Sequence, residues 1–120
     1  MSKKILIVED NAVNMYLITY ILKKKGYTVV QAANGQMGLD LAQLERIDMV
    51  LMDIQLPDMD GLVVTRRLRK MPCCGTIPII AVTSFAMFGD REQALAAGCN
   101  GYIEKPIDPL RFIDAVKEYC

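Results

Sequence analysis

The sequence of 120 residues is long enough for one domain with a single hydrophobic core, and its 52% of apolar residues are enough to fill that core. Lys and Arg together number 14, as do Asp and Glu, so the zero net charge gives no general attraction to nucleic acids or anionic membranes. The sequence contains no histidine, which excludes Ser-His-Asp and Cys-His catalysis, HExxH zinc sites and a phosphohistidine of its own.

The start of the chain lacks the pattern of a targeting signal. Only residues 5–8 form an apolar run before Glu9 and Asp10, whereas a signal peptide has about 7–15 apolar residues at this point. No run approaches the roughly 20 apolar residues that cross a bilayer. We therefore expect a cytoplasmic protein. Its four cysteines, which show no CxxC spacing, are expected to be reduced, with Cys99 in the core.

Short apolar segments alternate with helical ones along the chain. In chain order we predict strand 5–8, helix 12–25, strand 27–32, helix 36–45, strand 49–52, helix 61–71, strand 79–82, helix 90–97, strand 101–104 and helix 109–119. The first, third and fourth strands are almost continuously apolar, which is typical of strands covered on both faces. Gly98 is expected to end one helix, and Asp108 followed by proline to begin the last.

Five strands, each followed by a helix, predict a parallel sheet with right-handed crossovers. The three most apolar strands are expected in the centre, with the second and fifth at the edges. This gives the strand order 2-1-3-4-5 in a doubly wound α/β fold with helices on both faces. We expect one domain over residues 1–120, with no output domain after the last helix.

Polar residues follow four of the predicted strands directly. Glu9 and Asp10 follow the first strand, Asp53 the third, Thr83 the fourth, and Lys105 comes just after the fifth. The carboxyl ends of parallel strands lie at one edge of the sheet, where ligands bind. Three carboxylates, a hydroxyl and an ammonium are therefore expected to converge there. Taken singly, Asp10 would more often be a helix cap and Asp53 a turn former, so the prediction depends on their joint placement.

The chemistry of this set favours phosphoryl transfer with a hard metal ion. Two carboxylates about 4 Å apart repel by roughly 4 kcal/mol at an effective dielectric constant near 20, so three of them need a cation or a shared proton. Oxygen ligands in an incomplete protein cage suit Mg²⁺, which keeps several waters and accepts phosphate oxygens. An aspartate can carry a covalent phosphoryl group while Mg²⁺ and Lys105 neutralise charge on its oxygens.

Four stretches of the sequence resemble the receiver domains of two-component signalling, the CheY-like family. These are IVEDN (7–11), LMDIQLPDMDG (51–61), AVTSFA (81–86) and YIEKPI (102–107). They occur in the family's order with fitting separations, and the resemblance spans the whole chain. Within the family, NxxNM (11–15), DIQLP (53–57) and AVTSFAM (81–87) are most similar to DivK-like single-domain response regulators and to receivers of hybrid kinases. The resemblance implies a flavodoxin-like (βα)₅ fold.

The resemblance also implies a role for each acidic residue. Asp53 would be the phosphoacceptor, taking the phosphoryl group from a phosphohistidine on a sensor histidine kinase or a histidine phosphotransfer protein. Mg²⁺ would be bound by Asp10, Asp53 and the backbone carbonyl of Gln55. Glu9 would bind the ion mainly through water.

Further residues around this site acquire roles from the same resemblance. Thr83 and Lys105 would hold phosphoryl oxygens through their hydroxyl and ammonium groups. The peptide bond between Lys105 and Pro106 would be cis, as proline permits. Pro57 and Gly61 would shape the loop after the acceptor, with glycine allowing a positive φ.

The resemblance implies a switch that connects phosphorylation to a partner. Tyr102 would turn inward when Thr83 moves toward the phosphate. Met87 and Phe88 lie in an apolar stretch where a polar loop is expected, and with Tyr102 they would form part of a partner-binding face. Packing beneath the following helix remains the alternative for this stretch. Output would pass through a downstream protein, from a monomer or weak dimer.

The prediction is a single-domain response regulator of a phosphorelay that catalyses only its own phosphorylation and dephosphorylation. It would bind neither nucleic acid nor membrane. The alternative is a degenerate receiver that acts as a constitutive docking module. A flavodoxin is disfavoured because Glu9 and Asp10 would repel a flavin phosphate. A haloacid dehalogenase phosphohydrolase is disfavoured because Gln55 replaces the second Asp of its DxDxT motif.

Overall fold

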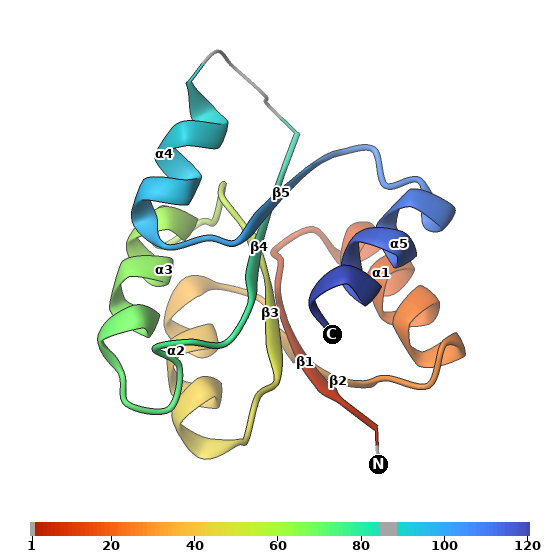
Figure 1. Ribbon diagram of the computed structural model, residues 1–120, viewed down its shortest axis with the longest axis horizontal. Helices are drawn as coiled ribbons and strands as arrows, with labels where there is room; N and C mark the ends of the chain where they lie inside the picture. Colours follow the sequence, from red (N-terminus) through yellow and green to blue (C-terminus); the bar gives the residue numbers. More distant parts are fainter. Residues whose placement is uncertain (1, 85–88) are drawn as a thin grey trace.

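The computed structural model describes residues 2–84 and 89–120, in which five strands form one parallel sheet. The strands are β1 (Lys4–Val8), β2 (Thr28–Ala32), β3 (Met49–Asp53), β4 (Ile79–Thr83) and β5 (Gly101–Glu104). Their order is β2-β1-β3-β4-β5, as predicted (Figure 1). The register pairs Val8 with Met52, Asp53 with Val82 and Thr83 with Glu104. The carboxyl ends of β1, β3, β4 and β5 therefore lie side by side at one edge of the sheet.

Five helices cover the two faces of the sheet. They are α1 (Ala12–Lys24), α2 (Gly35–Leu44), α3 (Gly61–Lys70), α4 (Asp90–Ala97) and α5 (Pro109–Tyr119). Helices α1 and α5 lie on one face, and α2, α3 and α4 lie on the other (Figure 1). The α/β layered fold predicted from the alternation of strands and helices is therefore confirmed.

The central strands are buried because each of their faces packs against helices. On β1, Ile5 and Ile7 belong to the core beneath α1 and α5, whereas Leu6 and Val8 belong to the core beneath α2, α3 and α4. Every residue of β3 and β4 is buried. Burial of an aliphatic side chain stabilises the fold by roughly 1.5–3 kcal/mol. Because neither face of these strands meets water, their sequences are continuously apolar.

Local signals in the sequence set most helix ends. The side chains of Asn11, Asn34, Asp60 and Asp108 each accept a hydrogen bond from a backbone N–H in the first turn of α1, α2, α3 and α5. Gly98 ends α4 in the left-handed conformation, with φ of 115°. These caps satisfy backbone groups that a helix leaves unpaired at its ends.

Seven of the ten predicted elements differ from the observed ones by one residue at one or both ends, and helix 90–97, strand 101–104 and helix 109–119 match. The cis peptide bond between Lys105 and Pro106 is confirmed. Cys99 is buried as expected, and the four cysteines are free thiols. The predictions for Met87 and Phe88 lie outside the described residues. Within the described ranges, no helix combines the length and the apolar character needed to cross a bilayer.

Candidate functional site

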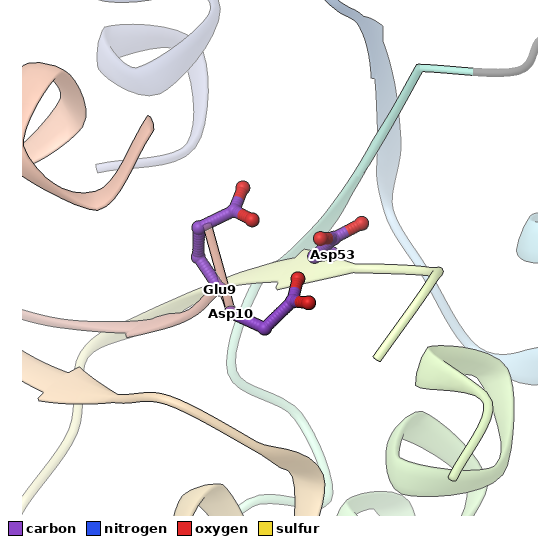
Figure 2. Close-up of side chains that lie close together, drawn as sticks. All are labelled: Glu9, Asp10 and Asp53. Carbon is purple, nitrogen blue, oxygen red and sulfur yellow. The ribbon is translucent and has the colours of Figure 1, made fainter. Parts of the chain in front are cut away.

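Three carboxylates meet at the carboxyl end of the sheet. Glu9 and Asp10 come directly after β1, and Asp53 is the last residue of β3 (Figure 2). One oxygen from each of the three groups lies within 4.8 Å of the others. Glu9 and Asp53 are 2% and 5% exposed, whereas Asp10 is open to solvent. The adjacent central positions of β1 and β3 account for this convergence.

A single ammonium group contacts the buried pair. Lys105 Nζ lies 2.6 Å from Glu9 Oε1 and 3.4 Å from Asp53 Oδ2, and the lysine side chain is 9% exposed. The backbone N–H of Asn11 donates to Glu9 Oε2 at 3.1 Å, and that of Gln55 donates to Asp53 Oδ1 at 3.0 Å. One positive charge therefore faces three acidic groups.

The protonation of Asp53 reflects this imbalance. Burial of the carboxyl group raises the pKa of Asp53 to about 7, and hydrogen bonding and charge repulsion from Glu9 act in the same direction. The Gln55 N–H and the Lys105 ammonium favour the ionised carboxylate, but they do not offset those effects on the pKa. Without a metal ion, Asp53 thus holds a proton over much of the acidic range.

Thr83 and Tyr102 lie on the next two strands. Thr83 is the last residue of β4 and is buried, and its carbonyl accepts a hydrogen bond from the Lys105 N–H at 2.7 Å. Tyr102 pairs with Ala81 in the middle of β5, and its ring packs against the core beneath α2, α3 and α4. The Tyr102 hydroxyl is enclosed, and within residues 2–84 and 89–120 no group forms a hydrogen bond with it.

The loop between β3 and α3 is closed tightly at its base. Gln55 forms an isolated bridge with Asp60, and the Gly61 N–H donates to the Ile54 carbonyl at 2.8 Å. Gly61 does not use the positive φ that glycine allows: among the described residues, Gly26, Gly89 and Gly98 have one. Glycine is needed here because a Cβ would collide with the backbone carbonyl of Asp53.

The role of one acidic residue of this loop, Asp58, is not predicted from the sequence. Asp58 accepts hydrogen bonds from the backbone N–H groups of Gly35 at 2.8 Å and Gln36 at 2.9 Å, at the start of α2. These two bonds lower the pKa of Asp58. Its partners are more than 20 positions away in the sequence, and beside Pro57 the residue reads only as a turn former.

The donor set suits a small divalent cation. At 4.8 Å or less, each pair of ionised carboxylates repels by roughly 3.5 kcal/mol or more at an effective dielectric constant of 20. Carboxylate oxygens and water are the ligands that Mg²⁺ prefers, and its charge would relieve this repulsion. In the described part of the chain, this is the one group of three acidic, histidine or cysteine residues placed to hold a metal ion.

The fold and the acidic site together define a class of signalling proteins. Residues 5–117 match the model of the response regulator receiver domain. The chain therefore belongs to the family of response regulator receiver domains. It is 47% identical over 119 residues to the polar-differentiation response regulator DivK of Brucella anthropi, covering 99% of this chain and 97% of that relative.

Two solved structures extend this comparison. The receiver domain of the sensor histidine kinase PA1611 of Pseudomonas aeruginosa, with a magnesium ion coordinated in its active site cleft, is 38% identical, with a TM-score of 0.91 over 99% of this chain and 98% of that one. The receiver domain of Ssk1 of Saccharomyces cerevisiae, solved with the histidine phosphotransfer protein Ypd1, represents a more distant match. It is 26% identical, with a TM-score of 0.88 over 98% and 88% of the two chains.

The raised pKa of Asp53 predicts a pH-dependent gain in stability for Asp53→Asn in EDTA. The pKa is 3.8 in the unfolded chain and about 7 in the folded one, so charging Asp53 destabilises the fold as the pH rises between these values. Asparagine carries no charge, so its gain in unfolding free energy should grow by roughly 2 kcal/mol from about pH 5 to pH 8. Urea denaturation at the two pH values measures this.

Asp40→Asn is the matched control, because Asp40 is exposed on α2 and is not a member of the cluster. Its effect on the unfolding free energy should be small and nearly independent of pH. A pH-independent gain for Asp53→Asn would contradict the raised pKa.

Proposed function

We propose that Asp53 of this receiver accepts a phosphoryl group from a phosphohistidine and that the phosphorylated form binds a downstream protein or passes the group on. The main support for this proposal is the position of the Asp53 carboxylate, which is buried at the end of a central strand and lies close to both Asp10 and the Lys105 ammonium. An oxygen of Asp53 forms a bond to phosphorus while the bond from phosphorus to the donor's imidazole nitrogen breaks, and the imidazole leaves with the electron pair.

Each neighbouring group has a part in this proposal. Asp10, Asp53 and the carbonyl of Gln55 would hold Mg²⁺, which supplies positive charge to offset the phosphoryl oxygens. Glu9 would act through water, since Lys105 and a backbone N–H already contact its oxygens. Lys105 and Thr83 would hold phosphoryl oxygens. As an enzyme the protein would catalyse only its own phosphorylation and dephosphorylation.

A small phosphodonor provides the first test. Incubation of the protein with acetyl phosphate and Mg²⁺ should add one phosphoryl group, detected by intact mass, because the site itself positions the nucleophile and neutralises the oxygens. EDTA and Asp53→Asn should each abolish the gain. Lack of phosphorylation by both acetyl phosphate and a phosphorylated histidine kinase, together with no Mg²⁺ binding, would favour a constitutive docking module.

The output is proposed to pass through Tyr102. This residue lies on β5, the strand next to the one that ends with Thr83, and it lines a groove of about 460 Å³ with Arg111 and other residues between β5 and α5. Movement of Thr83 toward the phosphoryl group would shift the population of Tyr102 inward and alter this face. Met87 and Phe88, which lie outside the described residues, are assigned to the same face from sequence alone.

Tyr102→Ala should therefore leave phosphorylation intact but weaken its effect on partner binding. Coupling between two such sites is typically about 1–3 kcal/mol, or 5- to 150-fold in affinity. In the variant, the affinities of phosphorylated and unphosphorylated protein for a downstream partner should become nearly equal. Tyr102→Phe keeps the ring and should retain the difference. Unchanged discrimination by Tyr102→Ala would remove the tyrosine from the mechanism.

The phosphodonor is proposed to dock on α1. A donor histidine must reach Asp53, so its protein must cover the carboxyl end of the sheet, and α1 begins two residues after Asp10. Val13 and Tyr16 in its first turns are 75% and 72% exposed. The ring of Tyr16 stacks on that of Tyr20, and Tyr20 lines an apolar groove of about 580 Å³ between α1 and α5. Exposed apolar surface of this kind is typical of protein-binding sites.

Tyr16→Ala should slow phosphorylation by a phosphohistidine protein about fivefold or more, since interface tyrosines often contribute over 1 kcal/mol. Phosphorylation by acetyl phosphate should not change, because that donor needs no docking surface. Leu44→Ala is the control: Leu44 is 80% exposed but lies at the far end of α2. Equal slowing with both donors would contradict docking through Tyr16.

The remaining assignments follow from this function. We place the protein in the cytoplasm, where histidine kinases present their phosphohistidine, as a single receiver domain over residues 1–120. A monomer or weak dimer is proposed, with protein partners and no binding to nucleic acid or membrane, in agreement with the zero net charge.

A further inference from the structure

The loop between β3 and α3 is held at both its base and its tip. At the base, Gln55 bridges to Asp60, and Gly61 donates to the Ile54 carbonyl. At the tip, the two oxygens of Asp58 accept the N–H groups of Gly35 and Gln36 at 2.8 and 2.9 Å. These two bonds join the loop tip to the start of α2. Helix α2 follows β2, which is separated from β3 in the sheet by β1.

The contact at the tip is specific in its geometry. The first turn of α2 has its own cap, since Asn34 Oδ1 accepts the Met37 N–H at 2.8 Å. Asp58 takes the two N–H groups that this cap leaves, and the helix dipole favours its negative charge there. Beside it, Met59 packs so closely on Gly35 that a Cβ at Gly35 would lie 2.7 Å from Met59 Cγ.

Helix α2 is in turn fixed against β1. Gly38 lies against the side chain of Val8, and a Cβ at Gly38 would come within 2.9 Å of that side chain. Val8 is fully buried and is followed directly by Glu9 and Asp10. The contacts therefore run from the loop that carries the Gln55 carbonyl, through Asp58 and α2, to the strand that carries the other acidic residues.

We propose that Asp58 is a positioning residue for the metal site, holding the Gln55 carbonyl at the correct distance from Asp10 by docking the loop onto α2. This rests on the proposed function, in which that carbonyl binds Mg²⁺. The two groups come from different strands. Leu56 and Met59 of the loop pack against the core, but within the described residues the hydrogen bonds that join the loop tip to α2 are those of Asp58, so loss of Asp58 lets the carbonyl move relative to the carboxylates. Outer groups that orient metal ligands commonly change metal affinity by about 10-fold or more.

The test compares Asp58→Ala with Asn34→Ala. Both variants remove a side-chain acceptor from the same end of α2, two hydrogen bonds in Asp58→Ala and one in Asn34→Ala, but only Asp58→Ala detaches the loop. Calorimetric titration with Mg²⁺ should show a dissociation constant about tenfold higher in Asp58→Ala. In Asn34→Ala it should stay within about twofold of the wild type, even where thermal unfolding shows a similar loss of stability.

Amide hydrogen exchange of residues 54–60 without Mg²⁺ is the second measurement. Exchange should be faster in Asp58→Ala and unchanged in Asn34→Ala, because only the first variant frees the loop. Wild-type exchange in Asp58→Ala, or a wild-type dissociation constant despite faster exchange, would overturn the positioning role. Equal weakening of Mg²⁺ binding in both variants would also overturn it. Absence of Mg²⁺ binding by the wild type would instead contradict the proposed function, and hydrogen exchange would still decide whether Asp58 holds the loop.

Discussion

Repulsion among Glu9, Asp10 and Asp53 is the constraint on which the rest of the site depends. The parallel sheet brings these groups together, and the hydrophobic core fixes the strands that carry them, so the carboxylates cannot move apart to relieve the repulsion. Lys105 offsets one charge, and a proton on Asp53 offsets another. The folded chain is thereby prepared to take up a cation, and an ionised Asp53 beside that cation is a nucleophile already in place.

Most of the fold could be predicted because its signals are local. Continuous apolar runs such as Ile5 to Val8 mark strands buried on both faces, and Asp108 followed by proline marks the start of the last helix. The rule that parallel strands end at one edge then converts these local predictions into a three-dimensional one. It predicts that Glu9, Asp10 and Asp53 lie together, and the distances among their oxygens agree.

The features that escaped prediction depend on contacts between distant segments. Nothing near Asp58 in the sequence indicates that its carboxylate binds the first turn of α2. Gly61 was expected to be needed for its backbone angle, whereas the requirement is space beside the Asp53 carbonyl, which only the packed structure reveals. The same holds for Lys105, whose shorter contact is with Glu9 rather than with Asp53.

The sheet is asymmetric about the acceptor strand. β3 and β4 are buried along their whole length, whereas β5, at the edge, is partly exposed throughout. Tyr102 and Ile103 of β5 still pack against the two cores, but replacing a half-buried residue there removes less of the core than replacing a residue of β3 or β4. In an evolutionary lineage of such proteins, new binding partners can arise by substitution along this edge, while the acidic end of the central strands tolerates almost no change.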